Sequence, residues 1–85
     1  MLKAEIYITL KKTISDPQGL TIKHALESLG YKGIADVRIG KLVTIGLASK
    51  SSKDAEKEVE QMCKKLLANP IIENYRFQIK EERNK

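Results

Sequence analysis

The segment from Ala35 to Ala48 alternates two kinds of side chain without a break. Its odd-numbered positions are apolar except for one lysine, and its even-numbered positions are mixed: Ala35, Val37, Ile39, Lys41, Val43, Ile45 and Leu47 against Asp36, Arg38, Gly40, Leu42, Thr44, Gly46 and Ala48. Because successive side chains of a strand point to opposite faces, the odd-numbered set predicts one buried face. A hairpin turning at Gly40-Lys41 would expose the apolar residues of the second half instead. We therefore expect one long strand, bent where its glycines loosen it.

Such a strand is long for a chain of 85 residues. At about 3.3 Å per residue it would reach roughly 46 Å. A compact chain of this length has a diameter of only about 30 Å, so the strand should project beyond its own domain. A projecting apolar strand with free backbone edges is a site where another chain can pair. This favours an assembly protein over an enzyme.

The residues before this segment predict a strand and then a helix. Apolar residues alternate with polar ones from Leu2 to Leu10, which is the pattern of a strand. Asp16 can accept a hydrogen bond as the N-cap of a helix, and Pro17 suits its first position. The apolar stripe of this helix has i, i+3, i+4, i+7 spacing and consists of Ile22, Ala25, Leu26 and Leu29.

The residues after the long segment predict a second helix and a last strand. Ser51 and Asp54 have the spacing of a capping box, and Asn69-Pro70 ends the helix. The last strand places four of its residues on one side, namely Ile71, Tyr75, Phe77 and Ile79. Residues 81–85 have the charged composition of a frayed tail.

These elements predict a single α+β domain over residues 1–85 with the order β-α-β-α-β. We expect a variant of the ferredoxin-like fold, in which two helices cover one face of an antiparallel sheet. The segment Ala35–Ala48 would be its long, bent central strand. If that strand breaks in two, the order becomes β-α-β-β-α-β. The other face of the sheet is then left for a partner.

Charge and hydropathy argue against two classes of partner. The net charge of +5 invites a nucleic-acid interpretation, but no run of basic residues is longer than two, and aromatic residues are few. We therefore expect a solvated surface and no nucleic-acid partner. No apolar run approaches the ~20 residues of a membrane-spanning helix, so we expect no membrane partner.

Candidate catalytic groups are sparse. His24 is the only histidine and lies off the apolar stripe of its helix, whereas Cys63 falls on the expected core face of the second helix. Neither has the neighbours of a metal ligand or an activated nucleophile. No phosphate-binding motif surrounds Gly40. We therefore expect no catalytic, metal or cofactor residue on this chain. One cysteine cannot form an internal disulfide, which is typical of the cytoplasm.

Three segments point to a known family. They are Asp16-Pro17-Gln18-Gly19, then Asp36-Val37-Arg38-Ile39-Gly40-Lys41, then Met62-Cys63-Lys64-Lys65-Leu66-Leu67-Ala68-Asn69-Pro70-Ile71-Ile72-Glu73-Asn74-Tyr75. At this spacing they resemble the PurS family, the small subunit of phosphoribosylformylglycinamidine synthase in purine biosynthesis. The resemblance covers essentially the whole chain. It departs from the family pattern at Pro70, and Gly46 interrupts the apolar second half of the long strand.

The resemblance implies a role inside an ATP-dependent, glutamine-using C–N ligase complex. In multi-subunit forms of this enzyme a glutaminase subunit releases ammonia, and a synthetase subunit, where ATP and Mg are expected, uses it. The PurS-like subunit is implied to be a non-catalytic homodimer, or a higher oligomer, that bridges the two and assists ammonia transfer. The resemblance supplies no catalytic residue for this chain.

Two groups of residues are candidates for the partner or dimer interface. They are Asp16, Gln18, Gly19, Asp36, Arg38, Gly40, Lys41, Val43 and Ile45. We expect the Ala35–Ala48 strands of two protomers to pair. For Asp36 and Arg38 a structural alternative is that the two side chains only neutralise each other.

Two other functions stay open. A dimeric ferredoxin-like sensor would bind a small molecule without any protein partner. An RNA-binding module would show an affinity that falls steeply with salt, but it would need exposed aromatic residues paired on a central strand.

Overall fold

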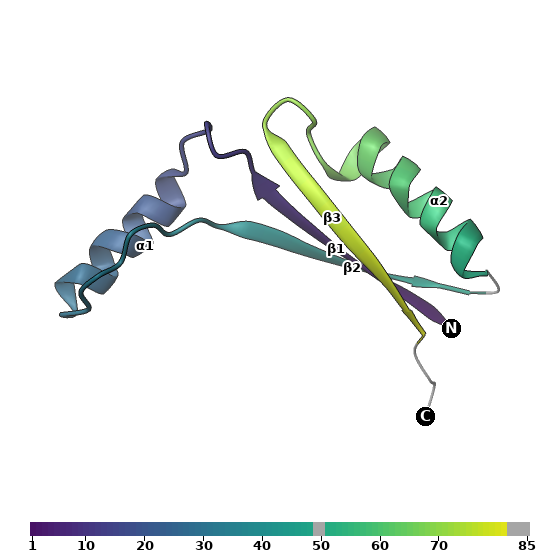
Figure 1. Ribbon diagram of the computed structural model, residues 1–85, viewed down its shortest axis with the longest axis horizontal. Helices are drawn as coiled ribbons and strands as arrows, with labels where there is room; N and C mark the ends of the chain where they lie inside the picture. Colours follow the sequence, from purple (N-terminus) through teal and green to yellow (C-terminus); the bar gives the residue numbers. More distant parts are fainter. Residues whose placement is uncertain (49–50, 82–85) are drawn as a thin grey trace.

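The computed structural model describes residues 1–48 and 51–81, which form a three-stranded antiparallel sheet with two helices (Figure 1). The elements follow in the order β1 (Leu2–Leu10), α1 (Pro17–Ser28), β2 (Gly40–Leu47), α2 (Ser52–Met62), a π-helical turn η1 (Cys63–Leu67) and β3 (Glu73–Glu81). The predicted α+β class and the order β-α-β-α-β are confirmed. No helix within the described residues is long and apolar enough to cross a membrane.

The core lies between α2 and one face of the sheet. The even-numbered residues of β1 from Leu2 to Ile8 are buried, and Ile6 and Ile8 are almost inaccessible to solvent. From the helical side Val59 and Cys63 fill the space above them and are fully buried as well. Partly buried residues of β3 pack around this cluster, among them Phe77. The hydrophobic contact with the sheet is therefore made by α2 together with η1 and Ala68, and not by α1.

The parity of the long segment is confirmed, but its paired part is shorter than predicted. β2 pairs with β1 in one unbroken antiparallel register from Leu2↔Leu47 to Thr9↔Gly40, which excludes a hairpin at Gly40. The odd-numbered side chains face α2, and Leu47 is buried. Residues 35–39 lie outside β2, and the Ile39 amide donates to the Asp16 carboxylate and not to a strand.

The central strand of the sheet is β1, not the long segment. The strand order is β2-β1-β3, so β2 is an edge strand. β1 is central because it pairs with β3 from Leu2 to Leu10 and with β2 from Leu2 to Thr9. One long side of β2 is left without a partner among the described strands.

The two helices do not both cover the sheet, and this differs from the prediction. α2 lies along the sheet, whereas α1 projects from one end of it (Figure 1). The stripe that was expected to be core is open to solvent in the single chain, with Ile22 39% and Leu29 74% exposed. The radius of gyration is 16.6 Å, whereas a compact chain of this length would have one of about 12 Å.

Asp16 holds α1 in its projecting position. One carboxylate oxygen accepts from the Gly19 amide over 2.9 Å and caps the helix, and the other accepts from the Ile39 amide over 2.7 Å. Asp16 is only 8% exposed, and no other charged residue of the described segments is buried. A single side chain thus ties the start of α1 to the strand-like segment that leads into β2.

Arg38 and Gly19 complete this junction, which we call the clamp (Asp16, Gly19, Arg38 and Ile39). The Arg38 guanidinium donates to the carbonyl oxygens of Lys11 and Ile14, over 2.9 and 2.8 Å. A Cβ atom at Gly19 would lie 2.1 Å from the Val37 carbonyl oxygen, so only glycine allows this approach. The clamp makes residues 16–39 one unit, the arm.

The start of α2 agrees with the sequence pattern, whereas both ends of the last strand differ from it. Ile71, predicted to lie on that strand, precedes β3 and is 80% exposed. The Asp54 amide donates to the Ser51 hydroxyl, as the capping box predicts. Glu81, expected to begin the frayed tail, is the last residue of β3. The rest of that predicted tail, residues 82–85, lies outside the described residues.

Replacing Gly19 with alanine tests the clamp by steric means. The Gly19→Ala variant should lower the free energy of unfolding by about 1–3 kcal/mol, because the new methyl group overpacks the junction. Urea unfolding and hydrogen exchange at the Ile39 amide would measure this. The matched control is Gly46→Ala, where a Cβ would meet only the flexible Met1 sulfur at 3.4 Å. Equal effects of the two substitutions would contradict the clamp.

The acid sensitivity of Asp16 provides a second test. The Ile39 and Gly19 amides hold the pKa of Asp16 below its usual value of 3.8. A lowered folded-state pKa means that these bonds stabilise the fold fully above pH 3.8 and are lost as the pH falls through the folded-state value. The Asp16→Asn variant should therefore be less stable than the wild type at neutral pH, and the difference should shrink in acid. Chemical unfolding at a series of pH values measures it, and a pH-independent difference would contradict the prediction.

Candidate functional site

The structure brings most of the predicted interface residues to the place where the arm meets the sheet. Asp16, Gly19 and Arg38 lie in the clamp, and Gly40 opens β2 immediately after it. Lys41 lies 3.7 Å from the Glu73 carboxylate on β3. The remaining two strand residues, Val43 and Ile45, are half-buried on the α2 side of β2.

The clamp residues and their exposed neighbours play different parts. Arg38 bonds to backbone carbonyls, and no hydrogen bond or ion pair links it to Asp36 among the described residues, which disfavours mutual neutralisation. Asp36 is exposed beside a shallow hollow of about 200 Å³ that also includes Lys23. Gln18 is exposed on the first turn of α1. The clamp therefore shapes the arm, and Gln18 and Asp36 are free to meet another molecule.

A second surface, which the sequence patterns did not single out, lies on the side of the sheet opposite α2. We call it the open sheet face. Its residues come from alternate positions of all three strands. They are Lys3, Glu5, Tyr7, Thr9, Gly40, Leu42, Thr44, Gly46, Asn74, Arg76, Gln78 and Lys80. The pairing register arranges them in rows of three across the sheet, with the β1 residue in the middle of each row.

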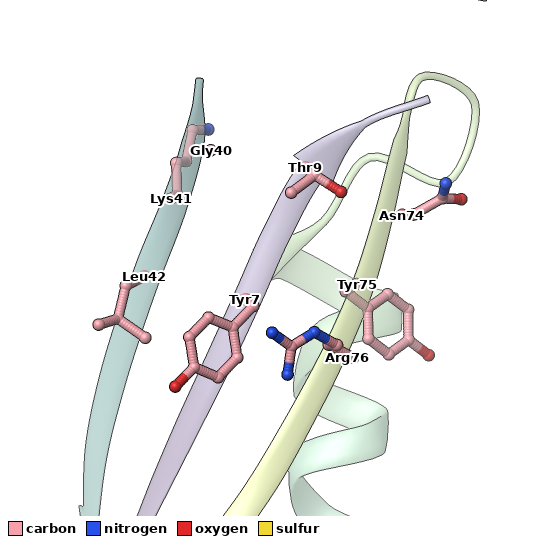
Figure 2. Close-up of a pocket in the computed structure, with 8 residues that line it drawn as sticks. All are labelled: Tyr7, Thr9, Gly40, Lys41, Leu42, Asn74, Tyr75 and Arg76. Atoms are coloured by element: carbon pink, nitrogen blue, oxygen red, sulfur yellow. The ribbon is translucent and has the colours of Figure 1, made fainter. Parts of the chain in front are cut away.

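One end of the open sheet face is hollowed (Figure 2). The hollow has a volume of about 380 Å³, and Gly40 and Thr9 line one end of it. Next to it, Tyr7 lies opposite both Leu42 and Arg76 in the register. The Arg76 guanidinium sits 4.2 Å from the centre of the Tyr7 ring, a cation–π contact. Tyrosine and arginine beside an apolar side chain are typical of the energetic centre of a protein interface.

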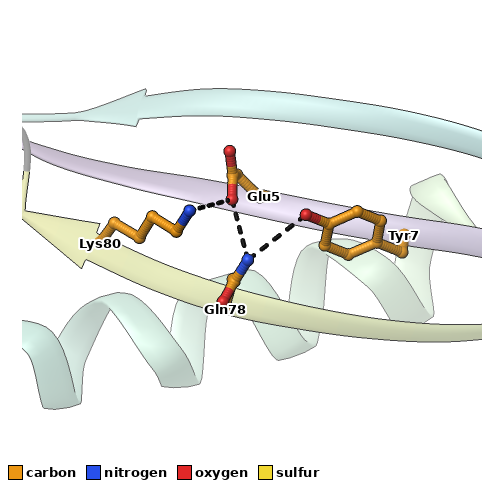
Figure 3. Close-up of polar contacts among 4 residues, drawn as sticks. All are labelled: Glu5, Tyr7, Gln78 and Lys80. Carbon is orange, nitrogen blue, oxygen red and sulfur yellow. Dashed lines mark hydrogen bonds and ion pairs between the residues drawn. The ribbon is translucent and has the colours of Figure 1, made fainter.

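A network of polar side chains continues from Tyr7 along the same face (Figure 3). The Gln78 amide donates to the Glu5 carboxylate over 2.9 Å and to the Tyr7 hydroxyl over 3.3 Å. The Lys80 ammonium lies 3.1 Å from the same Glu5 oxygen. That ion pair lowers the pKa of Glu5 and raises the pKa of Lys80. The polar groups are therefore already oriented before any partner arrives.

Two titratable groups on the α2 side of the sheet, Tyr75 and Cys63, have raised pKa values. The Tyr75 hydroxyl donates to the Glu60 carboxylate, which raises the pKa of Tyr75 to about 12. Burial raises the pKa of the Cys63 thiol, and a protonated thiol is a poor nucleophile. In residues 1–48 and 51–81 no group of three or more His, Cys, Asp or Glu side chains could hold a metal ion.

Comparisons with known proteins agree on one family. The family model of PurS, described as phosphoribosylformylglycinamidine (FGAM) synthase, matches residues 3–81. The phosphoribosylformylglycinamidine synthase subunit PurS of Bacillus subtilis is 44% identical over 81 residues, which are 95% of each chain. The subunit of the same name from Methanocaldococcus jannaschii is 40% identical over 81 residues, covering 95% of this chain and 98% of that one.

Solved structures give the same result. The crystal structure of M. jannaschii PurS, a subunit of formylglycinamide ribonucleotide amidotransferase in the purine biosynthetic pathway, superposes with a TM-score of 0.86 at 38% identity and covers 98% of this chain and 100% of that one. A chain of the PurLQS structure from Thermotoga maritima superposes with a TM-score of 0.81 at 26% identity, covering 93% and 98%. The chain therefore belongs to the PurS family of phosphoribosylformylglycinamidine synthase subunits.

Proposed function

We propose that this chain is the bridging subunit of its phosphoribosylformylglycinamidine synthase, without catalytic residues of its own. It docks the glutaminase subunit to the ATP-dependent synthetase subunit and assists the passage of ammonia between them. The observation that carries the proposal is the likeness of the whole chain to a chain of the PurLQS structure from T. maritima. In this assignment ATP and Mg belong to the synthetase subunit, and the complex is cytoplasmic.

The reactivity of ammonia explains why a bridging subunit is useful. Ammonia released into water at neutral pH is mostly protonated and loses its nucleophilicity, so a docked and water-poor path protects it. Two larger subunits must be held at a fixed distance for such a path to exist. A small subunit with two separate contact surfaces, the open sheet face and the exposed part of the arm, is suited to that task.

The open sheet face is the surface that we assign to a partner subunit. Its Tyr7–Arg76 contact and the Glu5 network are held in place by cross-strand neighbours, which lowers the entropy lost on binding. Gln18 and Asp36 on the arm are assigned to contacts of the same kind, because both are exposed beside the clamp.

The edge of β2 is the surface that we assign to a second copy of this chain. An unpaired strand edge is a template for strand addition, and β2 with residues 35–39 forms a long one. Antiparallel pairing of two such segments would place Gly40, Lys41, Val43 and Ile45 at or near the dimer interface.

An activity comparison tests the bridging function. Glutamine-driven amidine formation by the synthetase and glutaminase subunits should depend on this chain, whereas the reaction driven by ammonium chloride should depend on it much less. Equal rates with and without the chain in both reactions would contradict the function. That outcome would favour the small-molecule sensor, which should bind its ligand without any partner subunit.

A charge reversal tests the open sheet face within that assay. Losing a central arginine of an interface costs about 2 kcal/mol or more, so Arg76→Glu should weaken binding to a partner subunit roughly 30-fold. Titrating the variant into the glutamine-driven assay measures the shift in the half-saturating concentration. Lys53→Glu, an exposed charge reversal on α2, is the matched control. An unshifted Arg76→Glu curve would remove this face from the partner contact.

A further inference from the structure

We propose that the hollow at the end of the open sheet face binds a carboxylate side chain of a partner subunit, with the Arg76 guanidinium and the Asn74 amide as its donors. The inference rests on the proposed function in taking the partner to be a subunit of the synthase. It goes beyond that function by naming the chemical group that the open sheet face receives.

Charge complementarity is the first argument. Eight residues line the hollow, and they include two cations and no carboxylate. One of the cations, Lys41, already has an ionic partner, because its ammonium lies 3.7 Å from the Glu73 carboxylate. The other, Arg76, forms no ion pair or hydrogen bond with any residue in 1–48 or 51–81. The charge that is left to neutralise in the hollow is therefore that of Arg76.

The contact with Tyr7 orients the Arg76 guanidinium without using its hydrogen-bond donors. A guanidinium carries five N–H groups in one plane, and stacking on a ring occupies only the face of that plane. The Arg76 guanidinium carbon lies 4.2 Å from the centre of the Tyr7 ring, and Figure 2 shows the two side chains beside each other. A carboxylate is the group whose two oxygens match two parallel N–H donors of such a fork.

Asn74 supplies further donors next to Arg76. The two residues lie two positions apart on β3, so they share the open sheet face at a spacing of about 7 Å along the strand. The Asn74 carbonyl oxygen accepts from the Lys11 ammonium over 3.1 Å, which orients the amide. Its NH2 group donates to no acceptor among the described residues. Arg76 and Asn74 together can therefore bond to both oxygens of one carboxylate.

The shape of the hollow favours a carboxylate carried by a protein over a free anion. All the lining residues belong to the three strands of one sheet, so the hollow has walls on one side only. Sites for small ligands enclose most of the ligand's surface, which a single sheet face does not. A side chain on a larger partner surface brings its own cover, which excludes water from the charge pair. Leu42, which is 57% exposed beside the hollow, offers that surface an apolar contact.

An isosteric substitution tests the charge requirement. Asn74→Asp keeps the size of the side chain and an acceptor for Lys11, but it places a carboxylate beside Arg76. The new charge repels the partner's carboxylate and occupies the guanidinium, so binding to the partner subunit should weaken roughly tenfold or more. Arg76→Lys should also weaken it, because an ammonium lacks the two parallel donors. Lys53→Met, which makes the same change in net charge at an exposed position of α2, is the matched control.

Calorimetric titration of each variant into the synthetase subunit and into the glutaminase subunit measures these affinities. Circular dichroism verifies that the variants fold. The control should bind like the wild type. An Asn74→Asp chain that binds both subunits as tightly as the wild type does would overturn the proposal.

Carboxyl footprinting of the partner subunits identifies the bound group. Carbodiimide and glycine ethyl ester modify accessible Asp and Glu side chains, and mass spectrometry reports the reaction rate of each. The wild-type chain should protect an acidic residue of one partner subunit, and that residue should react again in a complex with Arg76→Met at equal occupancy. Replacing that residue with lysine should restore binding to the Arg76→Glu chain. Protection that is the same with both chains would overturn the proposal.

A titration of the chain alone distinguishes a protein carboxylate from a free anion. With acetate or inorganic phosphate as the probe, the NMR signal of the Arg76 side-chain N–H should show no saturable shift at submillimolar concentrations. A saturable shift that Asn74→Asp abolishes would make the hollow a site for small anions and would overturn the proposal.

The outcome is separable from that of the bridging function. A wild-type chain that supports glutamine-driven turnover, with an Asn74→Asp chain that binds equally well, would contradict the carboxylate site alone. A wild-type chain that is dispensable for turnover, yet protects an acidic partner residue through Arg76, would contradict the bridging function alone.

Discussion

The hydrogen bonds of the Asp16 carboxylate determine the shape of this molecule. One oxygen starts α1 and the other holds the Ile39 amide, so a helix that could have packed on the sheet is instead tied to the segment entering β2. Because the carboxylate is buried, separating these elements would leave a charge without its donors, which is costly. The projecting arm and the apolar stripe open to solvent both follow from that one junction.

Local features of the fold could be predicted from the sequence because they depend on neighbouring residues. The alternation of β1 and β2, the helix cap at Asp16 and the capping box at Ser51 each report on a few consecutive positions, and the structure agrees with them. The packing of α1 could not be predicted in the same way. A stripe such as Ile22 to Leu29 indicates which side of a helix must be buried, but not which chain will bury it. The central position of β1 was missed for a related reason, since strand order depends on contacts between distant segments.

The candidate site shows the same difference between local patterns and contacts of distant segments. The motifs around Asp16 and Arg38 mark residues that lie together, and in the single chain these two side chains bond to backbone groups of their own fold. Their place at a partner interface stays a prediction. The partner contact that we propose lies instead on the open sheet face, where Tyr7 and Arg76 meet across two strands. Their encounter depends on the β1–β3 register, which no local pattern reveals. Under the proposed function, the recognisable residues of the clamp serve shape and the residues of the open sheet face serve contact.

The titration of Asp16 tests the central junction most directly. In NMR spectra recorded over a series of pH values, the amide protons of Gly19 and Ile39 should shift together as the Asp16 carboxylate is protonated, because both amides donate to it. We expect one shared midpoint below 3.8, because these hydrogen bonds lower the pKa of Asp16. Amide protons that shift independently of each other, or a midpoint at or above 3.8, would contradict it.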